Sequence, residues 1–166
     1  MSQTSAPLRD MVKGSLGLLA EPFGPCDVRS KVQPAAKSFF GRLVVRDGAS
    51  ADKVKHPTAT ISDLQTIEGV VSSSHAVEQN GSDDPGYAAK DAVNVMKKGY
   101  IWVAIEETVA VGDPVFVRFA AGTGTKLGAF RNDADTATCV DISSVAKWVE
   151  GGTAAQGVAL LSLNLL

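Results

Sequence analysis

The chain has 166 residues, of which 45% are hydrophobic and 20% charged, so it has the size and composition of one globular domain rather than a disordered tail. Its 16 Lys and Arg residues nearly balance 18 Asp and Glu residues, and this net charge of −2 argues against nucleic acid as a partner, because phosphate binding requires a basic face. The longest apolar run is far shorter than the roughly 20 residues that cross a bilayer, so we expect no membrane partner.

Residues 1–38 differ from the rest of the chain and are predicted to be an extended N-terminal arm. Four prolines and three glycines interrupt every helical or strand period there, and each proline favours an extended conformation in the residue before it. The arm is nevertheless more apolar than a solvated linker, so we expect it to lie on a protein surface, that of its own subunit or that of a neighbour. Its candidate partner-binding residues are Leu8, Met11, Val12, Leu16, Leu18, Leu19 and Phe23.

Residues 39–166 are predicted to be a β-rich domain, because short apolar runs alternate there with clusters of turn residues. The elements expected in its first part are a strand at 40–46, a polar stretch at 49–56, strands at 58–61 and 67–71, and a short turn or helix at 62–66.

The strongest strand pattern lies between residues 92 and 119. Val93 and Val95 alternate with polar neighbours, and the Lys-Lys-Gly sequence at 97–99 is expected to turn the chain into a second strand at 100–105. That second strand is apolar on both faces, which indicates a central position in a sheet. A further strand at 115–119 follows Pro114, which lacks an N–H and therefore belongs at the start of a strand.

Weaker strands are expected at 126–130, 138–142 and 146–149, and a last strand extends to the end of the chain. In that last strand Ala159, Leu161, Leu163 and Leu165 share one face. The predicted class is all-β, with a small β-barrel or β-sandwich body, a jelly roll being a third form that the pattern leaves open.

The sequence shows no catalytic, cofactor or metal site. Cys26 and Cys139 lie far apart without CxxC spacing, so we expect two reduced thiols, although a single bridge is left open. His56 and His75 are accompanied by no GxSxG elbow, and the glycine-rich run at 122–126 lacks the Walker spacing and reads as a hairpin turn. The chain is therefore predicted not to be an enzyme.

Aromatic residues leave one alternative open. Trp102 and Trp148 stand beside valines in predicted strands, which makes them core or interface anchors first. A carbohydrate- or ligand-binding β-sandwich, with Tyr87, Tyr100 or Trp148 stacking on the ligand, is the second hypothesis.

The order of several short motifs resembles the cement, or decoration, proteins of tailed-bacteriophage capsids. The motifs are FGRLV at 40–44, EGVV at 68–71, Tyr87 with DAVNV at 91–95, KGYIWV at 98–103, VGDPVFV at 111–117 and GVALL at 157–161. Their ordered combination is more specific than any single motif.

This resemblance implies a structural virion protein without catalysis or a cofactor. It implies a β-rich protein, made in the host cytoplasm, that binds the outer surface of the assembled capsid, commonly as a homotrimer near local three-fold positions. Its partners would be the major capsid protein and other copies of itself, and its role would be to stabilise contacts between major capsid subunits.

Overall fold

The computed structural model describes residues 14–20, 25–74, 85–122 and 125–165, and these residues form β-strands, turns and one short 3-10 helix, η2 (Leu64–Thr66). This confirms the all-β class, and η2 lies within the turn or helix expected at 62–66. The strands are β1 (Asp27–Val32), β2 (Ser38–Phe39), β3 (Leu43–Arg46), β4 (Val54–Lys55), β5 (Ile67–Val71), β6 (Gly86–Tyr87), β7 (Ala92–Ala104), β8 (Phe116–Arg118), β9 (Phe130–Arg131), β10 (Cys139–Asp141), β11 (Ala146–Glu150) and β12 (Val158–Asn164).

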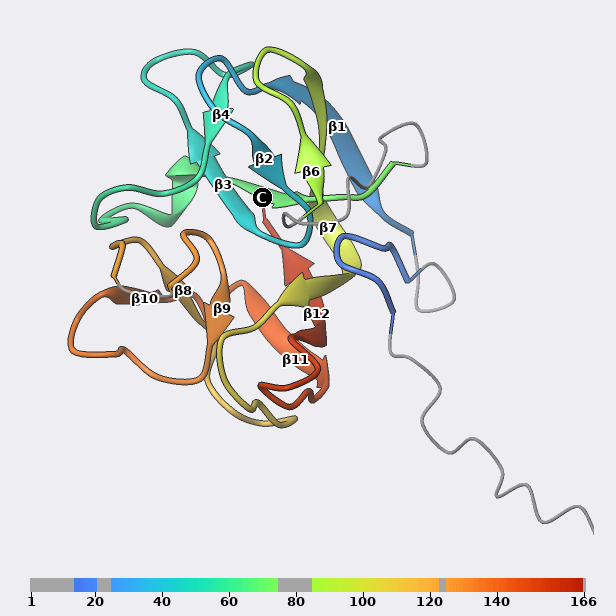
Figure 1. Ribbon diagram of the computed structural model, residues 1–166, viewed down its shortest axis with the longest axis vertical. Coiled ribbons are helices and arrows are strands. Elements are labelled where there is room, and N and C mark those ends of the chain that lie inside the picture. Colours follow the sequence, from blue (N-terminus) through green and yellow to red (C-terminus); the bar gives the residue numbers. More distant parts are fainter. Residues whose placement is uncertain (1–13, 21–24, 75–84, 123–124, 166) are drawn as a thin grey trace, which may run out of the picture.

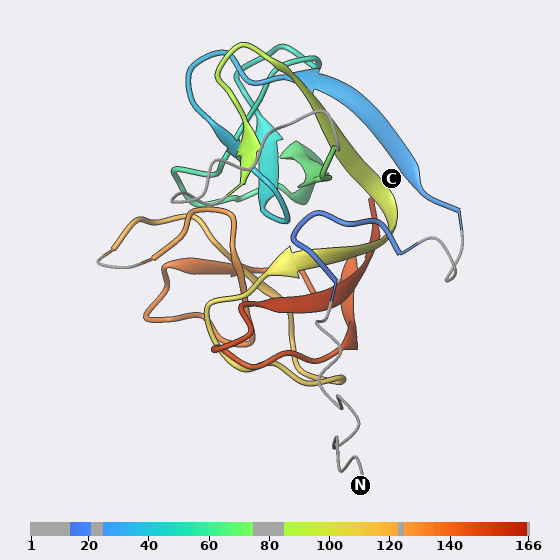
Figure 2. The same cartoon turned by 45° about the vertical axis from the view of Figure 1, so that its right-hand side comes forward.

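Strand β7 is the central strand of a seven-stranded sheet, whose order is β11-β12-β7-β5-β3-β4 with β1 paired to β7. Val95 and Met96 each have a partner in β1 and another in β5, so these two strands flank the first half of β7 on opposite edges. The second half pairs with β12 on one edge and with residues 17–20 on the other. Figures 1 and 2 show β7 passing from the part of the molecule that contains β1 and β3 into the part that contains β8 to β12. The central position predicted for residues 100–105 is confirmed.

The turn expected at 97–99 is wrong, because β7 continues through these residues. Lys98 has ladder partners on both strands that meet there, Asp27 of β1 and Asn164 of β12, and this pairing keeps the backbone extended. Gly99 has a φ of +133°, and a Cβ at this position would lie 2.6 Å from the Sγ atom of Cys26. The glycine therefore allows the close approach of Cys26 rather than a turn.

Three other strands differ from the sequence prediction. No strand forms at 58–61, and the stretch predicted to be polar, 49–56, supplies β4 instead, because Val54 is fully buried while residues 58–60 are exposed. The strand expected at 40–46 begins only at Leu43, after Gly41 with its φ of +67°. Of the run 126–130, only Phe130 enters a strand.

The remaining predicted strands are present as β5, β8, β10, β11 and β12. In β12, Ala159, Leu161 and Leu163 lie in the main core, and Leu165, just after the strand, packs against it. The predicted face of the last strand is therefore confirmed, while the strand itself ends at Asn164.

The core has two parts, on opposite faces of the large sheet. Neighbouring residues of β5 and of β7 enter different parts, since Val70 and Met96 belong to the larger cluster while Val71 and Val95 belong to the smaller. The larger cluster extends to the three-stranded sheet β10-β8-β9, and the smaller includes Tyr87 of the β2-β6 pair. This double burial explains why the first half of β7 has apolar residues on both faces.

The N-terminal region contributes to the sheet of the body. Strand β1 precedes residue 38, where the sequence analysis placed the boundary between arm and domain, and it pairs with β7 from Asp27 to Val32. Earlier in the chain, Leu19 forms an isolated bridge with Ile101. Residues 17–20 and β1 thus lie on the chain's own β7.

Candidate functional site

Of the seven arm residues predicted to bind a partner, Leu16, Leu18 and Leu19 lie in the described part of the chain, and Leu8, Met11, Val12 and Phe23 lie outside it. Leu16 packs against the smaller core cluster and Leu19 against the larger one. Leu18, between them, is 41% exposed. The structure therefore places Leu16 and Leu19 on the body and turns Leu18 outward.

Backbone hydrogen bonds hold this short segment on the edge of β7. The Gly17 N–H donates to the Trp102 carbonyl (2.8 Å), the Trp102 N–H donates to the Leu18 carbonyl (3.0 Å) and the Ala20 N–H donates to the Tyr100 carbonyl (2.9 Å). Gly17 also accepts from the Ser73 N–H at 2.8 Å, after the end of β5. These bonds hold the backbone of residues 17–20 against β7, so the exposed Leu18 side chain has a fixed position.

Exposed apolar side chains are concentrated in the same region. Of the four large hydrophobic residues that are exposed in the described structure, Leu18, Val28 and Val32 lie before residue 38 and only Val111 lies after it. Val28 and Val32 belong to β1, which pairs with β7 on one edge and has a single bridge, Val32 to Lys53, on the other. This region is the part of the described surface best suited to apolar contact with another protein.

A cavity of about 710 Å³ lies between the residues that follow β1 and the loop before β9. Its wall includes Gln33, Lys37, Phe39, Arg42, His56 and Lys126. Cations flank the Phe39 ring, with the Lys37 Nζ atom 5.3 Å and the Arg42 Cζ atom 4.2 Å from its centroid. The His56 ring stacks on the same aromatic ring, with centroids 5.7 Å apart.

His56 is held in a structural role. Its Nε2 atom accepts a hydrogen bond from the Phe39 N–H and its Nδ1 atom lies 3.0 Å from the Leu43 carbonyl oxygen. Burial lowers the pKa of His56 to about 4, so the ring is neutral at pH 7, with Nδ1–H as the donor to Leu43. Both ring nitrogens are bound to backbone groups, which leaves neither of them to act as a general base. His75 lies outside the described residues.

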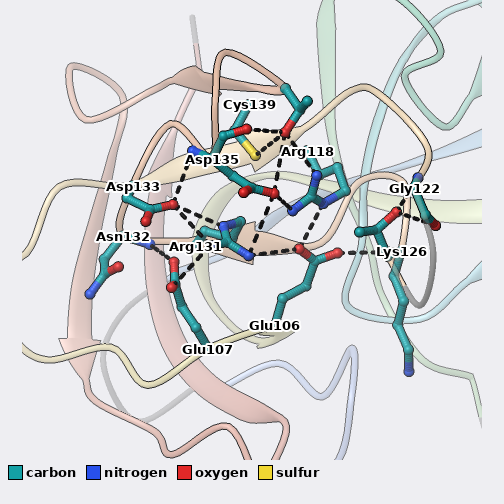
Figure 3. A network of polar contacts seen from close by, with 12 residues as sticks. Glu106, Glu107, Arg118, Gly122, Lys126, Arg131, Asn132, Asp133, Asp135 and Cys139 are labelled. Atoms are coloured by element: carbon teal, nitrogen blue, oxygen red, sulfur yellow. Dashed lines mark hydrogen bonds and ion pairs between the residues drawn. The ribbon is translucent and has the colours of Figure 1, made fainter.

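An ionic network links β8 and β9 to the end of β7 (Figure 3). Arg118 is buried and donates from Nε to Glu106 at 2.7 Å and from another guanidinium nitrogen to Asp135. Arg131 also contacts Glu106, at 3.3 Å, and Glu107, at 3.1 Å. The hydrogen bond from Arg118 lowers the pKa of Asp135. Each charged group in this network faces an opposite charge. We therefore interpret the network as one that stabilises the fold and not as a reactive site.

Sequence reasoning missed this network. Glu106, Arg118, Arg131 and Asp135 come from separate segments with no common spacing. The pairing of β8 with β9 brings the two arginines together, and the bridge between Ile105 and Phe130 places Glu106 beside them. Among the described residues, no group of three or more His, Cys, Asp or Glu side chains has the arrangement of a metal site. Cys26 and Cys139 form no disulfide.

The aromatic residues of the second hypothesis are mostly inside the protein. Trp148 and Tyr87 are buried, and the Trp148 Nε1–H donates to the Pro114 carbonyl at 3.1 Å. Trp148 also makes an edge-on contact with Phe130. Trp148 is thus a core anchor, as expected first, although it also lines a cavity of about 670 Å³ beside Pro114 and Lys147. The described chain also contains no helix with the length and hydrophobicity needed to span a bilayer.

Comparisons with known proteins agree with this picture of a β-rich structural protein. A search of curated proteins gave no match. A chain in a solved structure titled "The capsid of Myoviridae Phage XM1" has the same fold, with a TM-score of 0.73 and 18% sequence identity over 99% of this chain and 98% of that one. The family model described as "Structural cement protein (E217 gp24/Pam3 gp6)" matches residues 3–164. Because that match covers nearly the whole sequence, the chain belongs to the family of phage structural cement proteins, a family of virion components rather than enzymes.

Proposed function

We propose that this protein binds the outer surface of the assembled capsid as a homotrimer near local three-fold positions and stabilises contacts between major capsid subunits. The observation that carries the proposal is the family match over residues 3–164, which makes the chain a capsid component. The protein is made in the host cytoplasm, and its contacts are with protein, not with nucleic acid or membrane.

The distribution of exposed apolar side chains supports the N-terminal region as a contact surface. Leu18, Val28 and Val32 are exposed there, while Leu16 and Leu19 anchor the segment to the body. In this proposal Leu8, Met11, Val12 and Phe23 join Leu18 in the contact with a neighbouring subunit. An apolar segment with few competing charges gains free energy mainly by removing its side chains from water.

The same geometry supports the trimer of this proposal. Strand β1 lies at an edge of the sheet, and a closed ring of identical subunits covers such edges without leaving one exposed. A trimer that touches several capsid subunits also gains avidity, because each second contact forms at an effective concentration of about a millimolar for short linkages. Individually modest contacts then hold the particle together.

The test is to add the purified protein to capsids that lack it. Light scattering should give a trimer, a reconstruction of the decorated particle should show density on its outer surface, and the decorated capsid should resist heat better than the bare one. A monomer that fails to bind matching capsids would contradict the proposal.

The contribution of the arm needs a truncation that spares the sheet. Deletion of residues 1–13 removes no described strand, whereas deletion of residues 1–38 would also remove β1. Leu18→Ser should weaken capsid binding, and Val111→Ser, at the exposed hydrophobic residue outside this region, is the matched control. Equal binding by both variants and by the truncated chain would exclude the arm as a contact.

A further inference from the structure

The outer edge of β1 has backbone groups that point away from the sheet. The Val32 N–H, at the end of the strand, donates to the Asp52 carbonyl at 2.8 Å rather than to β7. Because alternate residues of a strand turn their backbone groups to the same side, those of Val28 and Ser30 also point away from β7. Among the described residues, none forms a hydrogen bond with these two backbones on that side. Figure 2 shows β1 at the outer side of the sheet, beside β7, where a further strand has a template.

The side chains of β1 make one of its faces suitable for apolar contact. Val28, Ser30 and Val32 share a face, because side chains alternate along a strand, and all three are exposed. Each valine is 38% exposed. On the other face Lys31 is buried and forms an ion pair with Glu68 at 3.1 Å. The exposed face therefore has an apolar, polar, apolar pattern that an added strand would cover.

A sequence with the same alternation precedes the described chain. Residues 8–13 read Leu-Arg-Asp-Met-Val-Lys, so an acidic side chain, Asp10, stands between the apolar Leu8 and Val12. Pro7 before them lacks an N–H, as suits the first residue of an added strand. One antiparallel register matches the two patterns, with Val12 opposite Val28, Asp10 opposite Ser30, and Leu8 beside Val32, where Asp52 already occupies the edge.

Charge favours this register over the parallel one. Antiparallel pairing brings Lys13 beside Asp27, whose carboxylate is exposed in its pair with Arg29. Parallel pairing that sets Leu8 against the first valine of β1 would instead place Arg9 against Arg29, two like charges directly opposite each other. In the antiparallel register Arg9 lies beside Lys31, whose charge is already compensated by its buried ion pair.

The position of Gly14 argues that these residues come from another copy. Gly14 lies against the Trp102 ring, since a Cβ on it would be 2.1 Å from the Trp102 Nε1 atom. Met96, the partner of Val28, is six residues back along β7, a span of about 20 Å. Two residues separate Val12 from Gly14, and they cover at most about 7 Å. Val12 therefore does not reach Val28 of its own chain.

We propose that residues 8–13 of one copy add as an antiparallel strand to the outer edge of β1 in the next copy. This deepens the proposed function and rests on it, since it names a contact that holds the homotrimer together. Backbone hydrogen bonds give the added strand its affinity, and the alternate side chains fix its register. Each copy gives a strand to one neighbour and receives one from the other, a head-to-tail contact that closes into a ring.

Two single-cysteine chains test the contact between copies. Both carry Cys26→Ala and Cys139→Ala, and one adds Val12→Cys while the other adds Val28→Cys. Opposite residues of an antiparallel pair have Cα atoms about 5.5 Å apart, which a disulfide spans. After co-expression and mild oxidation we expect a disulfide-linked heterodimer. Met11→Cys in place of Val12→Cys is the matched control and should give at least about tenfold less, because its side chain points to the other face. No heterodimer, or an equal yield from Met11→Cys, would overturn the proposal.

A proline variant tests the backbone of β1 directly. Ser30→Pro removes an N–H that points outward, so the pairing with β7 is kept, which slow amide exchange at Val95 would show. Self-association should weaken about tenfold, as expected for the loss of one hydrogen bond. Ser30→Ala is the control, because it loses the hydroxyl contact with Asn94 and keeps the N–H. Equal association of the two variants in sedimentation would count against the added strand.

The decorated particle identifies the occupant of the edge. A photoreactive benzoylphenylalanine at position 28 should join to residues 8–13 of another copy, seen by mass spectrometry of the cross-linked dimer. A product with the major capsid protein, or a cross-link only within one chain, would refute the proposal.

The two proposals fail in different ways. If the cysteine chains form the heterodimer and the wild-type protein does not bind capsids, the capsid function is wrong and the strand contact stands. If the wild-type protein binds capsids as a trimer while the cysteine chains give no heterodimer, the strand contact is wrong and the cement function stands.

Discussion

The Nε2 atom of His56 lies 3.0 Å from the backbone nitrogen of Phe39 and accepts its hydrogen bond. This contact ties β2 to the residue that follows β4, and it exists only while the imidazole is neutral at Nε2. The buried ring therefore makes the fold sensitive to acid at a defined position.

The first prediction concerns pH. The pKa of His56 is about 4 in the folded protein, below its ordinary value of 6.5, so the unfolded chain binds the proton more readily. The stabilisation is complete above pH 6.5 and is lost as the pH falls from 6.5 towards 4, with a total of about 3 kcal/mol. Urea unfolding between pH 7 and pH 4 should show this loss, and the variant His56→Gln should flatten the curve in that interval. An NMR titration in which the His56 ring signals move near pH 6.5 would contradict it.

The second prediction concerns Glu68, a buried carboxylate of β5. It forms ion pairs with Lys31 of β1 at 3.1 Å and with Arg46 of β3 at 2.8 Å. Burial raises its pKa, but the hydrogen bonds from Arg46 and Lys31 outweigh this and leave the pKa below its usual value. Glu68→Gln would leave the buried Lys31 ammonium without its countercharge and should lower the free energy of unfolding by about 3 kcal/mol.

The control for Glu68 is the more exposed pair of Lys55 and Asp47, which have the same 3.1 Å separation. Asp47→Asn should cost less than about 1 kcal/mol, because solvent screens an exposed pair. Equal losses in the two variants, measured by chemical denaturation, would show that burial does not strengthen the Glu68 contacts.

The third prediction concerns the guanidinium of Arg118. It donates to Glu106, Thr138 and Asp135 through three different nitrogens, a geometry that a lysine ammonium cannot reproduce. Arg118→Lys should therefore destabilise the protein by about 2–4 kcal/mol and loosen the three-stranded sheet, seen as faster amide exchange in β8 and β10. Arg29→Lys, at an exposed pair with Asp27, should have no measurable effect. If Arg118→Lys were as stable as the wild type, the positive charge alone, and not the three-way hydrogen bonding of the guanidinium, would stabilise the network.

The fourth prediction distinguishes two reasons why a position requires glycine, a positive φ and a lack of space for a Cβ atom. Gly69 and Gly48 both have positive φ, +138° and +68°, but a Cβ on Gly69 would lie 2.2 Å from the Met96 carbonyl oxygen, while one on Gly48 would meet nothing within 4 Å. Gly48→Ala should cost about 1 kcal/mol from backbone strain alone. Gly69→Ala should cost at least about 3 kcal/mol, because β5 must also move away from β7. Similar melting temperatures for the two variants would refute the steric argument.

Much of the fold was open to prediction from local patterns. A buried strand needs apolar side chains whatever its place in the sheet. This is why the alternation of Ala159, Leu161 and Leu163, and the apolar run at 100–105, could be recognised from the sequence. Their strand assignments were therefore correct. By contrast, the Lys-Lys-Gly sequence at 97–99 resembles a turn, and only the pairing of Lys98 with β1 and β12 shows that β7 continues.

The candidate site was predicted less completely. The apolar arm residues were identified by composition, but the sequence could not tell that Leu16 and Leu19 pack on the body while Leu18 faces outward. The cavity was not predicted, since Gln33, Phe39, Arg42 and Lys126 show no shared spacing.

The near-neutral sequence, rich in glycine and short apolar runs, by itself determined an all-β protein, and its ordered motifs pointed to the cement family. Only the tertiary structure decided where charge gathers, because a net charge of −2 is an average over the chain and says nothing about which side chains meet. Strand pairing collects carboxylates and arginines around Arg118 and brings lysines and an arginine around Phe39. The local sequence pattern determines which segments form strands, whereas long-range strand pairing determines which side chains become neighbours.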